Sequence, residues 1–325
     1  MISRRQVLGA APALAAASFA GGAFAQTAYP NKPIRIVVGN QAGGTDDGIS
    51  RFVADKLTKE WGQPVIVDNR GGGSTTIAGT HVATQPADGY TLMCLISAGI
   101  NQTVLRDKLP YRLNSFTPIV GVGGFPIALA VSAIAKPKIT NLEELTAAAR
   151  TGDGVTFGSG GVGTMGHLAC TRLLNAIKGK GVHVTYRNNP EGLQSLIGGH
   201  TQMFFASASE VSALRGEDKL RVLAVASPQR LPNLPDVPTL KELGVPDFEV
   251  LLWHGFVAPA GTPPEIVAKL ADGITRAVKD PEYLNRFRPL AYEEDIKTGE
   301  GLSAFINGEA AKWKKVIVDN NIKVE

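Results

Sequence analysis

Residues 155–170 read VTFGSGGVGTMGHLAC, a short β-type run followed by a glycine-rich turn and the opening of a helix. Backbone N–H groups at the N-terminus of a helix bind anions when glycines let the ligand approach closely. Gly161, Gly163 and Gly166 match the G-x-G-x-x-G pattern of dinucleotide-binding loops. One match in a chain with 37 glycines does not choose between a dinucleotide and another anion. The stretch predicts an anion-binding loop, and the rest of the sequence must identify the anion.

The composition is typical of a soluble globular protein. The 325 residues are enough for two lobes with buried cores, and 44% hydrophobic residues with 19% charged residues is an ordinary balance for folded domains. The formal net charge of +4 is small and no long run of Lys and Arg occurs, so we predict no nucleic-acid partner. Part of that charge comes from Arg4 and Arg5, which we expect to be removed with a leader peptide.

The first 25 residues resemble a signal peptide. SRRQVL at residues 3–8 is a twin-arginine pattern, and an alanine-rich apolar region leads to AFA at residues 23–25, the small-x-small pattern that signal peptidase cuts. The apolar region is too short to span about 30 Å of hydrocarbon. We expect residues 1–25 to be a twin-arginine signal peptide cleaved after Ala25, and the mature protein to be periplasmic.

Strand, loop and helix alternate along the chain. The continuous β-branched run 34–38 predicts a strand buried on both faces of a parallel sheet, and it leads into the polar, glycine-containing loop 40–47. The helix that follows has its apolar residues on one face and is expected to end at Gly62. Strands at 65–67 and 91–96 are likewise followed by small or polar residues. Because ligands of open α/β sheets bind outside the carboxyl ends of the strands, these loops are candidate binding loops.

Two lobes account for the order of the predicted elements. Residues 115–134 cross from one unit to the next, and a second βα set runs from 155 to about 226. Amphipathic helices at 264–279 and 299–318 need a sheet to cover, and the N-terminal set provides one. We predict an α/β fold with a mostly parallel sheet flanked by helices in each lobe. Lobe 1 is assigned 26–124 and 254–325, and lobe 2 is assigned 125–253.

The sequence offers little for catalysis. Ser159 lacks the G-x-S-x-G context of a nucleophile elbow because Phe157 stands where the first glycine is needed. The five histidines are scattered without metal-ligand spacing, so we expect no metal, no cofactor and no enzymatic activity. A dinucleotide site needs an acidic residue about twenty positions after the glycines, and none occurs there. Arg187 lies in that region and could meet a 2′-phosphate, so a periplasmic NADP oxidoreductase stays open as an alternative.

Individual roles are predicted for five other residues. Asp46 is predicted to be the N-cap of the helix after loop 40–47, and Asp47 to fix the Gly43–Gly44 turn as well. His167 is predicted either to fill space or to contact a ligand. Cys94 and Cys170 lie in apolar surroundings, which favours buried free thiols over a disulfide.

Six phrases spread over the mature chain resemble one protein family. They are YPNKPI at 29–34, GQPV at 62–65, DGYTL at 88–92, LPY at 109–111, LPDVPT at 234–239 and APAGTP at 258–263. Together they resemble the periplasmic solute-binding receptors of tripartite tricarboxylate transporters, also called Bug-type receptors. Each phrase alone is weak, and their combination and order make the resemblance specific.

The resemblance implies a two-lobed, Venus-flytrap type of binding protein that closes on a small carboxylate and passes it to membrane subunits of a transporter. It implies no catalysis, and we expect a monomer. Its ligand loops fall at 40–47, 71–75, 97–101, 159–164 and 185–188, and at the end of the 203–205 strand. The predicted ligand-binding residues are Asn40, Gln41, Ala42, Gly43, Gly44, Asp47, Gly73, Ser74, Thr75, Ser97, Asn101, Ser159, Gly160, Thr164, His167, Tyr186, Arg187 and Ser207.

Two departures from the family pattern concern the ligand. GNQAGG at 39–44 replaces the usual Pro-Phe/Tyr-x-Pro-Gly-Gly, so amides stand where the family has an aromatic residue and two prolines. Ala206 and Ser207 replace the usual Asp-Asn after the 203–205 strand. Because that carboxylate is lost, we expect an organic acid without an amine. A sensor that presents its ligand to a signalling partner remains a further alternative.

Overall fold

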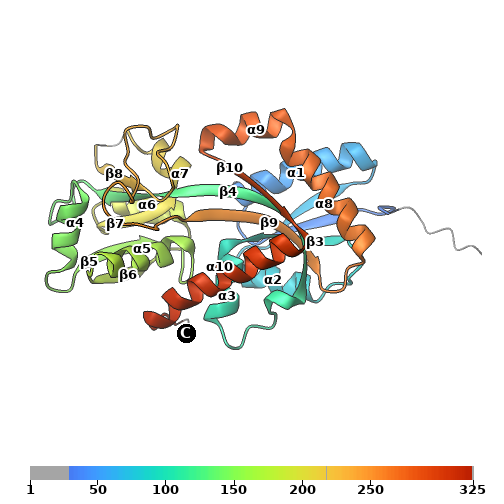
Figure 1. Cartoon of the computed structure of the whole chain (residues 1–325), viewed down its shortest axis with the longest axis horizontal. Coiled ribbons are helices and arrows are strands. Elements are labelled where there is room, and N and C mark those ends of the chain that lie inside the picture. Colours follow the sequence, from blue (N-terminus) through green and yellow to red (C-terminus); the bar gives the residue numbers. More distant parts are fainter. Residues whose placement is uncertain (1–28, 217, 324–325) are drawn as a thin grey trace, which may run out of the picture.

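The computed structural model describes residues 29–216 and 218–323 and has two α/β lobes (Figure 1). The predicted signal peptide and its cleavage site lie outside the described residues. Within the described part of the chain, no helix is both long and apolar enough to cross a membrane. With η for a 3-10 helix, the elements are β1 (Ile34–Val38), α1 (Thr45–Trp61), β2 (Val65–Asn69), η1 (Gly73–Thr75), α2 (Thr76–Ala83), β3 (Thr91–Ile96), α3 (Ser97–Leu105), η2 (Leu113–Ser115), β4 (Phe116–Ser132), α4 (Leu142–Ala149), β5 (Val155–Ser159), α5 (Met165–Ala176), β6 (Gly181–Thr185), α6 (Asn189–Ile197), β7 (Met203–Ser207), α7 (Ala208–Ala213), β8 (Leu220–Val225), β9 (Leu251–Pro259), α8 (Pro264–Lys279), α9 (Pro281–Phe287), η3 (Arg288–Leu290), β10 (Glu293–Thr298) and α10 (Gly299–Asp319).

Two long strands join the lobes. The strand order is β2-β1-β3-β9-β4-β7-β5-β6, with β8 and β10 also paired to β4. The outer strands are parallel, β2 and β3 to β1 in lobe 1 and β6 and β7 to β5 in lobe 2. Antiparallel pairing is confined to β4, β9 and their neighbours. The two-lobed α/β class expected from the sequence is confirmed.

Strand β4 changes partners part-way along its length. Up to Pro126 it pairs with β9, and from Ile127 onward it pairs with β7 and β8. Figure 1 shows β4 and β9 running side by side from one lobe to the other. The domain boundaries predicted at residues 125 and 253 stay a prediction, and they fall within these two strands.

Each lobe has a hydrophobic core on both faces of its sheet. In β1, Ile36 and Val38 pack in one cluster and Val37 in another, because successive side chains of a strand point to opposite faces. In β7, Phe205 and Phe204 divide in the same way between two clusters of lobe 2. The buried β-branched and aromatic residues of the central strands thus hold helices on both sides of each sheet.

Helix α1 illustrates how the sequence sets an element. Ile49, Phe52, Val53 and Leu57 are buried along one face, as their spacing predicts. Gly62 ends the helix with a left-handed φ of 65°, and its N–H donates to Thr58 O at 3.0 Å. Such a C-terminal glycine satisfies a helix carbonyl without the steric cost that a side chain would bring.

The terminal helix α10 packs against both lobes. Leu302 and Ile306 near its start belong to a core cluster of lobe 1, whereas Trp313 and Ile317 belong to a core cluster of lobe 2. Figure 1 shows α10 running beneath the long strands toward lobe 2. This helix was predicted to belong to lobe 1, but it contacts lobe 2 as well.

The two cysteines lie in separate cores as free thiols. Cys94 packs in lobe 1 and Cys170 in lobe 2, and both are buried. Burial raises the pKa of both thiols above the ordinary value for cysteine. The prediction of buried free thiols is confirmed.

Candidate functional site

Loops from the two lobes meet at the carboxyl ends of β1 and β5. Asn101 Nδ2 donates to Gly163 O at 3.1 Å, and Gln102 Nε2 donates to Val162 O at 3.3 Å. A methyl group added at Gly161 would lie 3.1 Å from Ser74 Oγ. We call this region the interlobe site and define it as loops 40–44, 71–75 and 159–164 with residues 97–102.

The glycines of the opening stretch have two separate structural roles. Gly161 has φ 139° and Gly163 has φ 79°, left-handed conformations that favour glycine. Gly166 lets α5 approach β7, since a methyl group there would lie 2.7 Å from Phe205 O. Gly160 likewise faces Asn189, whose Oδ1 would lie 2.9 Å from an added methyl group. The G-x-G-x-x-G pattern therefore builds a tight loop on the N-terminus of α5.

Hydrogen bonds inside the loop fix its first and last residues. The Ser159 hydroxyl lies 3.0 Å from Gly161 O and accepts from Gly161 N at 3.2 Å. Thr164 is the N-cap residue of α5, and its hydroxyl donates to Gly161 O at 2.8 Å. Ser159 is fully buried, so it supports the loop from within.

Two stacked histidines lie behind this loop. His167 Nδ1 accepts from Gly163 N at 3.1 Å, and His183 Nε2 lies 2.7 Å from Ser159 Oγ. Their rings are 3.9 Å apart with an interplanar angle of 9°, and Phe157 flanks them at 5.1 Å from the His183 ring. Burial lowers the pKa of His167 to about 3 and that of His183 to about 4, so both imidazoles are neutral at neutral pH.

His183 was not among the residues predicted from the sequence. It lies directly opposite Phe157 in the parallel β5–β6 pair, with Ser159 two residues further along β5. Placing His183 beside Ser159 requires the pairing register of the two predicted strands, and the sequence alone does not specify that register. His167 lies in the first turn of α5 and contacts the loop. This position is compatible with both predicted roles, filling space and contacting a ligand.

Carboxylates organise the first loop of lobe 1. Asp47 Oδ2 accepts from Gly43 N at 3.0 Å and from Arg51 Nε at 2.9 Å, so the predicted fixing of the Gly43–Gly44 turn is confirmed. Burial alone would raise the pKa of Asp47, but the hydrogen bonds from Arg51 and Gly43 outweigh it and lower the pKa. Arg51 thereby neutralises this carboxylate.

Asp46 has a different role from the one predicted. The N-cap of α1 is Gly44, whose lack of a side chain leaves no capping hydrogen bond, and Asp46 lies inside the first turn. Its Oδ2 accepts from Asn40 Nδ2 at 2.9 Å. Burial raises the pKa of Asp46 above its ordinary value. The N-cap prediction for Asp46 was wrong because the helix begins two residues earlier than assumed.

Loop 71–75 holds a strained backbone. Ser74 has φ 52° and Thr75 has φ 75°, left-handed conformations that are unfavourable for a β-branched residue. Thr75 is buried between Gly39 and Gly99, where added methyl groups would lie 2.7 Å from Thr75 Cβ and 3.1 Å from Thr75 Oγ1. Strain of this kind persists only where the surroundings impose it, and it gathers at functional sites.

Three buried polar atoms at or beside the interlobe site lack a hydrogen-bond partner within the described ranges. They are Thr75 Oγ1, Asn101 Oδ1 and Asp47 Oδ1. Leaving a buried polar group unsatisfied costs about 1–3 kcal/mol. A ligand hydroxyl that donated to Asn101 Oδ1 or Asp47 Oδ1, or a ligand oxygen that accepted from the Thr75 hydroxyl, would remove part of that cost.

Other predicted residues have structural partners. Ser97 begins α3 instead of lying in a loop, and its hydroxyl accepts from Trp253 N at 3.0 Å. Ser207 caps α7, with its hydroxyl 2.7 Å from Glu210 Oε2. The hydroxyl of Tyr186 bonds to Ser195 Oγ.

The remaining predicted contacts are more open to solvent. Arg187 is exposed and its backbone N–H donates to Glu191 Oε2 at 3.2 Å. Of the predicted residues in the two lobe 1 loops, the exposed ones are Asn40, Gln41, Ala42, Gly43, Gly44 and Gly73. Of the predicted set, Ser74, Thr75, Asn101, Ser159, Gly160, Thr164 and His167 surround the contact between the lobes.

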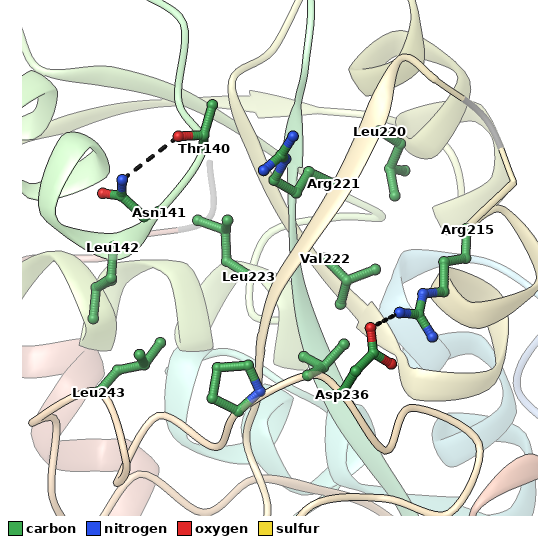
Figure 2. A pocket seen from close by; sticks show the side chains of 12 residues that line it. Thr140, Asn141, Leu142, Arg215, Leu220, Arg221, Val222, Leu223, Asp236 and Leu243 are labelled. Atoms are coloured by element: carbon green, nitrogen blue, oxygen red, sulfur yellow. Dashed lines mark hydrogen bonds and ion pairs between the residues drawn. The ribbon is translucent and has the colours of Figure 1, made fainter.

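A separate cavity opens on lobe 2, away from the interlobe site. Its volume is about 420 Å³, and its walls come from β8, residues 140–142 and residues 236–238 (Figure 2). Arg215 and Asp236 form an ion pair on its rim. None of the predicted ligand contacts lines it. Among the described residues no cluster of His, Cys, Asp and Glu could hold a metal ion.

Residues 49–322 match the model of a family described as Tripartite tricarboxylate transporter family receptor. The chain belongs to this receptor family. A UPF0065 protein from the tcbD-tcbE intergenic region of Pseudomonas sp. (strain P51) is 33% identical over 321 residues, 98% of this chain and 95% of the relative. The family predicted from the six phrases is therefore confirmed.

Solved structures of this receptor type superimpose over most of the chain. The periplasmic binding protein BugD has a TM-score of 0.80 at 28% identity, covering 91% of this chain and 100% of BugD. MatC from Rhodopseudomonas palustris with bound malate has a TM-score of 0.77 at 27% identity, covering 89% and 100%. Rpa4515 from R. palustris with adipate has a TM-score of 0.80 at 28% identity, covering 91% and 99%. The chain is thus a solute-binding receptor of the TctC/Bug type.

Proposed function

We propose that this receptor closes on a small organic acid at the interlobe site and delivers it to a tripartite tricarboxylate-type transporter. The observation that carries the proposal is the contact of the 159–164 loop with α3 across the lobes, beside the unpartnered Thr75 hydroxyl, which can donate to a carboxylate. The malate held by MatC and the adipate held by Rpa4515 support a carboxylate as the ligand class.

Neutral donors suffice to hold such an anion. Helices α1 and α5 both begin at loops of the interlobe site, and helix N-termini present unpaired N–H groups and a partial positive charge. Hydrogen bonds to a charged group contribute about 1.5–3 kcal/mol each. Four such bonds give roughly 6–12 kcal/mol, against about 8.2 kcal/mol for a micromolar complex. Arg187 is therefore not required for binding, although it could add a charge.

The charges near the site favour an acid without an amine. Asp47 is already neutralised by Arg51, and Glu210 accepts hydrogen bonds from the hydroxyl and the N–H of Ser207. Ala206 lies near the end of β7, at the position where the family pattern has a carboxylate. An ammonium group would therefore lose its hydration and meet only carboxylates that already accept hydrogen bonds, from Asn40 at Asp46, from Arg51 at Asp47 and from Ser207 at Glu210.

We further propose how the receptor is exported and how it acts in the cell. The protein is exported to the periplasm by the twin-arginine route, acts as a monomer and catalyses no reaction. The lobes, divided at residues 125 and 253, rotate about β4 and β9 as the ligand enters. The closed form is the one that membrane subunits recognise. A genomic neighbourhood without membrane subunits would favour the sensor alternative.

A thermal-shift screen tests the proposed ligand class. Residues 26–325 are heated with mono-, di- and tricarboxylates, aromatic acids, and the amino acids aspartate and glutamate. A ligand at 100 times its Kd stabilises the folded state by about 2.7 kcal/mol, so a true ligand gives a clear rise in Tm. We expect at least one carboxylate without an amine to do so. Stabilisation by no carboxylate in the panel would overturn the proposal.

A further inference from the structure

His183 and His167 together bond to both ends of the loop that faces the other lobe. His183 Nε2 lies 2.7 Å from the hydroxyl of Ser159, the last residue of β5, and His167 Nδ1 accepts from Gly163 N four residues later. The two rings stack at 3.9 Å, so each imidazole limits the movement of the other. A movement of either ring would be passed to the loop through these hydrogen bonds.

The opposite side of the same loop contacts lobe 1. Gly163 gives its N–H to His167 and its carbonyl oxygen to Asn101, so one residue is held from both lobes. The neighbouring carbonyl of Val162 accepts from Gln102. The position of the loop therefore decides whether the lobe 1 amides can reach it.

Neutral imidazoles suit this position better than other polar side chains. Both rings are largely buried, and burial keeps their pKa values well below neutral pH. A carboxylate would place a negative charge beside an anion-binding loop. An amide could hydrogen-bond to the loop, but it would offer no ring for stacking on Phe157, which lies 5.1 Å from His183 and 6.0 Å from His167.

We propose that His183 is a positioning residue for the binding loop, acting with His167 to hold residues 159–164 in the conformation that receives the ligand and the lobe 1 amides. The role of His183 in binding rests on the proposed function, whereas its role in holding the loop can be tested without any ligand. A loop fixed before binding loses less conformational entropy when the ligand arrives, which raises affinity.

Two substitutions separate the hydrogen bond from the stack. His183→Phe retains an aromatic ring for stacking but removes the bond to Ser159. His183→Gln retains a polar group that can reach the hydroxyl but removes the ring. Ser159→Ala removes the same hydrogen bond from the other side, together with the two bonds between the Ser159 hydroxyl and Gly161. His200→Ala, at an exposed position of lobe 2, is the matched control.

Amide hydrogen exchange of the ligand-free protein is the primary measurement. The net value of one hydrogen bond is about 0.5–1.5 kcal/mol, so we expect exchange of residues 160–164 to be roughly 2- to 12-fold faster in His183→Phe. Exchange in the buried part of α5, residues 168–174, stays at the wild-type rate. His183→Gln restores much of the protection, and His183→Phe/Ser159→Ala is no faster than Ser159→Ala alone, because both substitutions remove the same bond to His183. His200→Ala exchanges like wild type.

Two results would overturn the inference. Unchanged loop exchange in His183→Phe would mean that the bond to Ser159 does not position the loop. Equal acceleration of the loop and of residues 168–174 would mean that His183 only stabilises lobe 2. In addition, ¹⁵N NMR should show His167 protonated at Nε2, and protonation at Nδ1 would contradict the bond from Gly163 N.

Binding provides a second readout. With malate as the probe, His183→Phe should weaken binding by the same factor as the change in loop exchange, and His200→Ala should not. If the wild-type protein does not bind malate, that result bears on the proposed ligand class, while hydrogen exchange alone decides the role of His183.

Discussion

Asn101 Nδ2, in the first turns of α3, donates to the carbonyl oxygen of Gly163 in the other lobe at 3.1 Å. This bond and its neighbour from Gln102 link the lobes at the loop that begins α5. Their donors come from side chains of lobe 1 and their acceptors from the backbone of lobe 2. This contact between the lobes therefore depends on the amide N–H groups of Asn101 and Gln102, which carboxylates in their place could not supply.

Asn101→Asp tests this contact. The carboxylate is similar in size but cannot donate to Gly163 O, and its charge would repel a bound anion. We expect affinity for the carboxylate ligand to fall by at least about tenfold, equivalent to 1.4 kcal/mol, when measured by calorimetry. Asn175→Asp, on the exposed side of α5, is the control and should bind like wild type. Equal affinities of the two variants would contradict a role for Asn101 in the site.

Gly161→Ala tests the tight turn of the loop. Gly161 has φ 139°, and the added methyl group would lie 3.1 Å from Ser74 Oγ. A side chain in such a conformation costs about 1–3 kcal/mol. We expect both stability and ligand affinity to fall, with stability followed by urea unfolding.

A matched glycine gives the opposite result. Gly308 lies in the middle of α10 with nothing near its added methyl group. Gly308→Ala should stabilise the protein by roughly 0.5–1 kcal/mol, because alanine favours the helix. If both alanine variants stabilised the protein, the left-handed geometry at Gly161 would not be required.

Trp313→Ala tests the attachment of α10 to lobe 2. Trp313 is fully buried in a lobe 2 cluster, and its Nε1 donates to Glu309 Oε2 at 2.9 Å. Removing a buried tryptophan side chain typically costs about 3–5 kcal/mol of unfolding free energy. Lys314→Ala, one residue further along and exposed, should change stability by less than about 0.5 kcal/mol. A small effect of Trp313→Ala in urea unfolding would mean that α10 is not anchored there.

Two buried histidines and one partly buried histidine predict a loss of stability in mild acid. Burial lowers the pKa of His167 to about 3, and those of His183 and His254 to about 4, from an ordinary value of 6.5. The unfolded chain therefore binds protons below pH 6.5 that the folded chain does not bind. Stability is full above pH 6.5 and falls toward pH 4, by up to about 1.4 kcal/mol per pH unit for each histidine.

Urea unfolding at pH values from 8 to 4.5 measures this slope. Asp46 acts in the opposite direction, because its raised pKa lets the folded state take up a proton more readily than the unfolded chain. The paired carboxylates with lowered pKa values stay ionised over this range, as Asp47 illustrates. Unfolding free energies that do not change between pH 7 and pH 4.5 would contradict the burial of the imidazoles.

Sequence patterns predicted the elements whose signals are local. The β-branched run of β1, the apolar face of α1 and the glycine at its end gave boundaries that match the structure, as did the amphipathic pattern of α8. Strand β10, with the sequence EEDIKT, and the short helices α7 and α9 were not predicted. Charged strands at an edge lack the alternation that marks a half-buried strand, and six or seven residues hardly define a helical period.

The candidate site depends on relationships that no local pattern contains. Ser97 was expected in a loop, but no glycine or proline separates it from β3, and the chain turns directly into α3. His183 reaches Ser159 only because β5 and β6 pair in one particular register. The contact between Asn101 and Gly163 joins two lobes. Such contacts depend on tertiary structure, which a single sequence does not specify residue by residue.

Calorimetric titration of residues 26–325 with malate, adipate and aspartate tests the central claim most directly. Malate and aspartate differ only in a hydroxyl group in place of an ammonium group, so they form a matched pair. We expect malate or adipate to bind with a Kd near the micromolar range, aspartate to bind at least about tenfold more weakly, and Asn101→Asp to lower the affinity for the acid that binds. Tighter binding of aspartate, or an affinity that Asn101→Asp leaves unchanged, would contradict the central claim.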